Sequence, residues 1–112
     1  MKIFQTTLVC AFISLALFAF DANAVDADAA KALAKKSNCL RCHGIDKAKA
    51  GPAFNKVAEK YKAEANAEAK LINHLTSGEK AKFPDGHEEE HMILKTDDPA
   101  ETKNLVDWIL SL

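Results

Sequence analysis

The stretch "SNCLRCHGIDKAKAGPAFNKV", Ser37–Val57, contains the residues that decide what kind of protein this is. Cys39 and Cys42 stand three positions apart, and His43 follows the second cysteine at once. A Gly-Pro pair begins at Gly51, eight residues beyond the histidine. A cysteine pair at this spacing can form a redox dithiol, bind a metal ion or hold a covalently attached group.

A redox dithiol of the thioredoxin type fits the pattern poorly. Such a site needs a cysteine of lowered pKa at the start of a helix, normally within a βαβ unit. Here the pair comes at the end of an expected helix, and the chain shows no convincing alternation of strand type.

A zinc site is the more serious alternative. Cys39 and Cys42, taken with His87 and His91, reproduce the ligand types and the local spacings of a Cys2His2 site. However, 44 residues separate Cys42 from His87, whereas the usual finger has about 12 to 15 between its halves. A zinc site also leaves the adjacent His43 without a role.

The third interpretation uses every residue of the motif. The run "CLRCH", from Cys39 to His43, is the attachment signature of a c-type haem. The two cysteines form thioethers with the porphyrin edge, and His43 is placed as an axial ligand of the iron. One covalent haem c would also complete the core of a domain this small, in which apolar burial alone offsets chain entropy only marginally.

The first 24 residues have the features of an export signal. Lys2 supplies a positive charge, Leu8–Phe20 is a nearly unbroken apolar run, and Ala22–Ala24 offers small residues for cleavage. A membrane-spanning helix needs about 20 apolar residues, which this run does not supply. We therefore expect residues 1–24 to be cleaved, leaving a single periplasmic domain, 25–112, without a membrane span.

The charges are balanced overall but unevenly distributed. A formal net charge of −1 argues against nucleic acid as a partner, because nucleic-acid-binding surfaces are clearly basic. Lysines cluster after the cysteine pair, where they are either ordinary solvated residues or a rim that steers a partner. The candidates for such a rim are Lys47, Lys49 and Lys56.

The hydrophobic spacing predicts an all-α domain. The final helix has the clearest start, where Asp98, Pro99 and Glu101 fit a capping box with a proline inside it. Residues 79–95 show no sustained period and are expected to form a long functional or disordered loop. The other expected helices run from Asp26 or Asp28 through the cysteine pair to Gly44, from Pro52 to about Tyr61, and over residues 65–76.

The chain resembles the small bacterial class I c-type cytochromes of the short c-551/c-552 kind. The resemblance rests on "CLRCHG", "GPAFNKVAEKY", Met92 and "LVDWILSL", and it covers essentially all of residues 25–112. It implies about four helices around one covalently attached haem, with the first and last helices crossing. It also implies that the Pro52 carbonyl accepts a hydrogen bond from His43.

Met92 is the expected distal ligand of the iron. It is the only methionine of residues 25–112, and it lies 16 residues before Trp108, a spacing similar to that of the family. Its surroundings depart from the family, because "MIL" stands where prolines commonly follow the methionine, and the preceding loop is longer. That loop contains His87 and His91, and either could bind the iron instead, giving a bis-histidine haem of lower potential.

These residues predict a monomeric, periplasmic electron-transfer protein that exchanges electrons with redox partner proteins and is not an enzyme. The alternative is a haem sensor, or a ligand-binding or enzymatic subunit, whose sixth ligand is a histidine or is displaceable.

Overall fold

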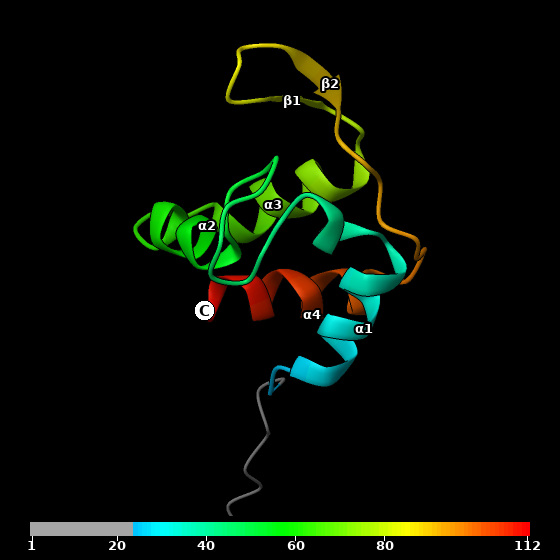
Figure 1. Ribbon diagram of the computed structural model, residues 1–112. Helices are drawn as coiled ribbons and strands as arrows, with labels where there is room; N and C mark the ends of the chain where they lie inside the picture. The colour runs from blue at the N-terminus through cyan, green and yellow to red at the C-terminus, as the bar shows by residue number, and fades with distance from the viewer. Residues whose placement is uncertain (1–23) are drawn as a thin grey trace, which may run out of the picture.

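The computed structural model describes residues 24–112, so the expected export signal lies outside the described residues except for Ala24. The described part contains four α-helices, a short 3₁₀ helix and one two-stranded antiparallel sheet (Figure 1). The elements are α1 (Ala27–Lys36), η1 (Cys39–Arg41), α2 (Phe54–Tyr61), α3 (Ala67–Thr76), β1 (Lys80–Lys82), β2 (Glu88–Glu90) and α4 (Pro99–Leu110). None of the helices in this part combines the length and the apolar character needed to cross a membrane.

The first and last helices cross and pack directly against each other, as expected. Small side chains on α1 permit the close approach, since Ala30 and Ala34 are completely or almost completely buried. Leu105 of α4 is likewise buried. Two hydrogen bonds join the ends of the crossing: the Asp26 amide donates to Asn104 Oδ1 over 2.9 Å, and Asn104 Nδ2 donates to the Asp26 carbonyl over 2.8 Å.

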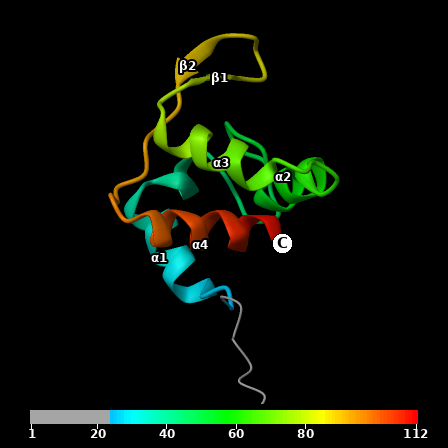
Figure 2. The ribbon, with the colours of Figure 1, turned by 180° about the vertical axis from the view of Figure 1, so that it is seen from behind.

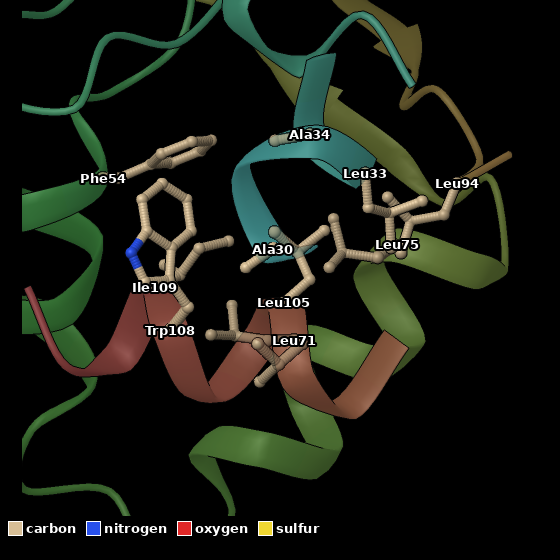
Figure 3. Packing of buried hydrophobic residues seen from close by; sticks show 11 residues of the cluster. Ala30, Leu33, Ala34, Phe54, Leu71, Leu75, Leu94, Leu105, Trp108 and Ile109 are labelled. Carbon is tan, nitrogen blue, oxygen red and sulfur yellow. The ribbon is translucent and has the colours of Figure 1, made fainter. Parts of the chain in front are cut away.

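The hydrophobic core surrounds α4 and receives side chains from each of the other helices (Figure 3). Phe54 of α2 meets Trp108 edge to face, with ring centroids 5.9 Å apart and planes at 80°, an arrangement that aromatic pairs favour. Leu71 and Leu75 of α3 and Leu94 of the connection to α4 complete the other end of the core. Phe54 and Trp108 are thus both buried in the core.

A β-hairpin occupies much of the segment expected to be an irregular loop, and the expectation that strands are missing was wrong. Strands β1 and β2 project away from the helices in both views (Figures 1 and 2). Lys80 lies opposite Glu90 and Lys82 opposite Glu88, so each pair places opposite charges side by side. Three-residue strands made almost wholly of charged residues carry no hydrophobic alternation, which is why their sequence gives no strand signal.

Three helix boundaries also differ from expectation. Helix α1 ends at Lys36 rather than continuing to Gly44, because Asn38 adopts a left-handed conformation with φ of 60° and redirects the chain. Helix α2 begins at Phe54, two residues after Pro52. Helix α3 begins at Ala67, two residues later than expected.

At α4, Asp98 caps the helix by accepting a hydrogen bond from the Ala100 amide over 2.8 Å. Glu101 does not complete the expected capping box with the Asp98 amide. Its carboxylate accepts from the Thr96 hydroxyl, and the Asp98 amide instead donates to that same hydroxyl oxygen. Thr96 therefore accepts the hydrogen bond from the Asp98 amide that the capping-box pattern assigns to Glu101.

Candidate haem site

The two cysteines lie on a single tight turn. Backbone bonds from the Cys42 and His43 amides to the Cys39 carbonyl, at 3.2 and 2.9 Å, close this turn. Residues three apart in a 3₁₀ turn lie on the same side, so both cysteines face the same way. Both are free thiols and half-buried. Burial raises the pKa of the Cys39 thiol, the opposite of the shift that a reactive dithiol requires.

The segment 44–52 folds back along this turn and fixes its shape. The Gly51 amide donates to the Cys42 carbonyl over 2.7 Å, and the Gly44 amide donates to the Lys47 carbonyl over 3.0 Å. A Cβ atom at position 44 would collide with the Lys47 carbonyl oxygen. Glycine is therefore needed at this position for close approach, and the left-handed turn after α1 occurs at Asn38.

His43 is held in one orientation by its neighbours. Its Nδ1 lies 2.6 Å from the Pro52 carbonyl oxygen. Because a carbonyl can only accept, Nδ1 carries the proton and Nε2 keeps its lone pair for a metal. The Phe54 ring stacks on the imidazole at a centroid distance of 5.1 Å, and a Cβ at Gly51 would stand 2.5 Å from His43 Cε1.

Two of the three residues proposed from sequence for the distal side, His91 and Met92, lie in the segment between the hairpin and α4. Met92 has 49% of its surface exposed. The His91 ring faces that of His43, with the two centroids 6.2 Å apart and the planes at 48°. His91 Nδ1 donates to the Met92 carbonyl over 2.9 Å. Burial, followed by the charge of His74, lowers the pKa of His91.

The sequence reasoning assigned no role at the site to His74 of α3. Its ring centroid lies 4.1 Å from that of His91, and its Nδ1 lies 2.8 Å from a carboxylate oxygen of Glu79. The only signal in the sequence is that His74 directly precedes the buried Leu75, close to the inward face of α3.

His87 is not part of this group. It lies at the tip of the hairpin, where it stacks on Phe83 with centroids 4.4 Å apart. Its Nδ1 bonds to Asp85, and its Nε2 lies 3.2 Å from a carboxylate oxygen of Glu89. The zinc alternative also lacks support, because residues 24–112 contain no group of three or more His, Cys, Asp or Glu side chains placed to hold a metal ion.

A sequence profile of the cytochrome c family matches residues 27–112. The chain belongs to the cytochrome c family. It is an electron-transfer c-type cytochrome and not an enzyme, and it carries covalently attached haem c. Cytochromes of this family act with redox partner proteins.

Relatives of known name agree with this assignment. Cytochrome c-551 of Pseudomonas denitrificans is 34% identical over 80 residues, covering 71% of this chain and 93% of the relative. Cytochrome c-552 of Nitrosomonas europaea is 32% identical over 108 residues, covering 96% of this chain and 98% of the relative. This chain is 66% identical in sequence to class 1 cytochrome MtoD from Sideroxydans lithotrophicus ES-1, and it matches that crystal structure with a TM-score of 0.75. The match covers 79% of this chain and 97% of that structure. The expected class I cytochrome c fold is confirmed.

The donor groups of this cytochrome fit a haem. Cys39 and Cys42 offer two free thiols from one side of a rigid turn, and His43 follows with its Nδ1 tied to the backbone. Thiols and a neutral imidazole are the groups that c-type attachment and iron ligation use. A fixed tautomer is what a metal-binding histidine requires of its surroundings.

Proposed function

We propose that this cytochrome is a periplasmic carrier of single electrons whose haem iron has His43 and Met92 as axial ligands. In this proposal Cys39 and Cys42 form the thioether bonds, and Pro52 accepts the hydrogen bond that orients His43. The single observation that carries the proposal is the anchored imidazole directly after the cysteine turn, with 2.6 Å between Nδ1 and the Pro52 carbonyl oxygen.

The backbone around Met92 supports its role as distal ligand. On one side, the His91 amide donates to the Glu79 carbonyl over 3.0 Å. On the other side, the Leu94 amide donates to the Leu75 carbonyl over 3.0 Å. Met92 therefore stands between two anchored points, on a segment already fastened to α3. Its half-exposed thioether is free to turn toward a bound group, because it is not packed into the core.

The protein residues have a limited and well-defined task in electron transfer. The haem supplies an iron that cycles between two oxidation states, and the axial ligands set its potential. The Pro52 carbonyl fixes the His43 ring and makes the imidazole a stronger donor. When both axial positions are filled by protein, no substrate can bind at the metal, which suits a carrier.

The periplasmic location rests on the export signal in residues 1–24, and the redox partners are proteins of unknown identity that meet the cytochrome there. Mass spectrometry of the haem-loaded protein tests the signal. We expect a mature chain that begins at Val25, with the mass of one haem added. A chain that retains Met1 after export would contradict this part of the proposal.

The ligand assignment is tested by replacing the thioether. We expect the ferric wild-type protein to show the low-spin spectrum and the weak near-infrared band of sulfur–iron charge transfer, and Met92→Ala to lose that band. Ile93→Ala is the matched control, because Ile93 is the next residue and is 54% exposed. Retention of the band in Met92→Ala would exclude Met92 as the ligand.

The exposure of Met92, 49% of its surface, also favours a second candidate function. A weakly held sixth ligand would let the iron bind a small molecule, as in a haem sensor. Carbon monoxide added to the reduced wild-type protein separates the two functions. A rapid, saturable spectral shift supports a sensor, whereas no shift supports an electron carrier.

A further inference from the structure

We infer that His91 is a second distal ligand built into this cytochrome, and that its Nε2 binds the iron whenever the Met92 sulfur leaves it. This inference rests on the proposed function, in which His43 is the proximal ligand. Of the three other histidines that the described residues contain, it concerns His91, because the His91 ring stands against His43, whereas both ring nitrogens of His87 face carboxylates.

His43 and His91 have the same anchoring. His43 Nδ1 lies 2.6 Å from the Pro52 carbonyl oxygen, and His91 Nδ1 lies 2.9 Å from the Met92 carbonyl oxygen. Since a carbonyl oxygen can only accept, both rings carry their proton on Nδ1. Both therefore present the lone pair of Nε2, the state in which a neutral imidazole binds a metal.

The separation of the two rings matches shared coordination of one metal ion. Their centroids are 6.2 Å apart. Two imidazoles on opposite sides of a metal are separated by about 6 Å, from two metal–nitrogen bonds of about 2.0 Å and roughly 1.1 Å from each nitrogen to its ring centre. The angle of 48° between the planes is compatible with this, because two ring planes that both contain the metal–nitrogen axis can meet at any angle.

The backbone holds His91 at this position independently of its side chain. The His91 amide donates to the Glu79 carbonyl over 3.0 Å, at the base of the hairpin. The ring is half-buried and packs on His74 at 4.1 Å, and His74 is itself held by the Glu79 carboxylate. The adjacent Met92 is 49% exposed, whereas the His91 ring stands 6.2 Å from that of His43.

The two other histidines are poor competitors. His74 keeps a free Nε2, since only its Nδ1 is engaged, by Glu79 at 2.8 Å, but the ring that stands against His43 is that of His91. Both ring nitrogens of His87 face carboxylates at the hairpin tip, one from Asp85 and one from Glu89. A nitrogen that donates to a carboxylate has no lone pair to give to iron.

The exchange is chemically balanced. One iron–sulfur bond breaks and one iron–nitrogen bond forms, and both ligands are neutral before and after. No proton is released, because His91 already carries its proton on Nδ1. Methionine ligation raises the potential and thus favours the ferrous state. Oxidation therefore shifts the balance toward His91.

The decisive experiment compares the ferric EPR and optical spectra of haem-loaded wild type, Met92→Ala, the double variant Met92→Ala/His91→Ala, and the control Met92→Ala/His87→Ala. We expect Met92→Ala and the His87 double variant to be low-spin with two nitrogen ligands. We expect the His91 double variant to be high-spin. A high-spin Met92→Ala, or a low-spin His91 double variant, would overturn the inference.

Failure of the inference can be told apart from failure of the Met92 assignment. If the wild type shows no sulfur–iron band, the assignment of Met92 is refuted. The ferric spectra of the single variant His91→Ala then decide whether His91 is the resident ligand or is not a ligand at all. Far-UV circular dichroism and haem content check that each variant is folded. If His91→Ala does not retain haem, His91→Gln replaces it, because glutamine keeps much of the volume but lacks the imidazole lone pair.

Discussion

At the scale of single residues, Gly51 decides how the proximal imidazole is held. A Cβ atom at this position would stand 2.5 Å from His43 Cε1 and 2.9 Å from Nδ1, closer than non-bonded atoms approach. The Gly51→Ala variant must therefore push the ring away from the Pro52 carbonyl. We expect a loss of stability of about 1–3 kcal/mol, as for other overpacked sites, and an altered ferric EPR spectrum.

Gly86→Ala is the control for this steric effect. Gly86 has a φ of 93°, which strains any residue with a side chain, but a Cβ there meets no atom within 4 Å. We expect this variant to loosen the hairpin tip and to leave the haem spectrum unchanged. If both variants change the spectrum equally, contact with His43 is not the cause.

The residues of the proximal side could be predicted from the sequence because they are neighbours in it. Cys39, Cys42 and His43 form one continuous motif, and their geometry follows from a single turn. His91 and His74 could not be brought together in the same way. Their contact depends on where the hairpin returns the chain after α3, and the hairpin leaves no mark in the local pattern.

At the scale of elements, the hairpin tip responds to pH through His87. The bond to Asp85 raises the pKa of His87, and the same bond lowers the pKa of Asp85. The stabilisation from His87 is fully present below its ordinary pKa of about 6.5, and it is lost as the pH rises through the raised value. The contribution of Asp85 is present above about pH 3.9 and is lost as the pH falls through its lowered value.

We therefore expect the tip to be most ordered between about pH 4 and pH 6.5 and to loosen at higher pH. NMR order parameters of the Gly86 and His87 amides, measured across this range, check the expectation. His87→Gln is the control, because glutamine is neutral throughout and should remove the loss of order at high pH. Identical profiles for wild type and variant would show that His87 is not responsible.

The crossing of α1 and α4 depends on Asn104 as well as on apolar packing. Asn104→Ala removes both hydrogen bonds to the Asp26 backbone, and we expect it to cost about 1–2 kcal/mol in total. Asn66→Ala is the control, since the Asn66 side chain makes no capping bond at α3. Urea denaturation measures both, and an equal loss in the two variants would contradict the role of Asn104.

At the scale of the whole molecule, the number and order of the helices could be predicted because each leaves a local signal. Leu71 and Leu75 of α3, and Leu105 and Trp108 of α4, recur at helical spacing. The hairpin has no such signal, because its strands consist almost wholly of exposed charged residues. Its antiparallel pairing uses the backbone, so hydrophobic spacing does not reveal it.

The three lysines of the proposed rim, Lys47, Lys49 and Lys56, differ in whether other groups of the protein engage their ammonium groups. Lys49 Nζ donates to the Leu40 carbonyl over 2.7 Å, which holds its charge beside the attachment turn. Lys56 pairs with Glu59 over 2.7 Å, so part of its field is cancelled. Lys47 is exposed, and the fold uses only its backbone, whose carbonyl accepts from Gly44. Of the three, Lys47 is therefore the best steering charge to reverse without disturbing the turn.

We expect Lys47→Glu to slow oxidation of the reduced protein by hexacyanoferrate(III) several-fold at low ionic strength, because it weakens attraction of the anion to the attachment side. The difference should shrink as salt shortens the screening length toward about 8 Å. Stopped-flow absorbance of the haem measures the rates. Lys31→Glu, an exposed lysine of α1, changes the charge equally outside the attachment loop. If it slows the reaction as much as Lys47→Glu, net charge rather than a rim governs the encounter; if neither variant changes the rate, these lysines do not steer the partner.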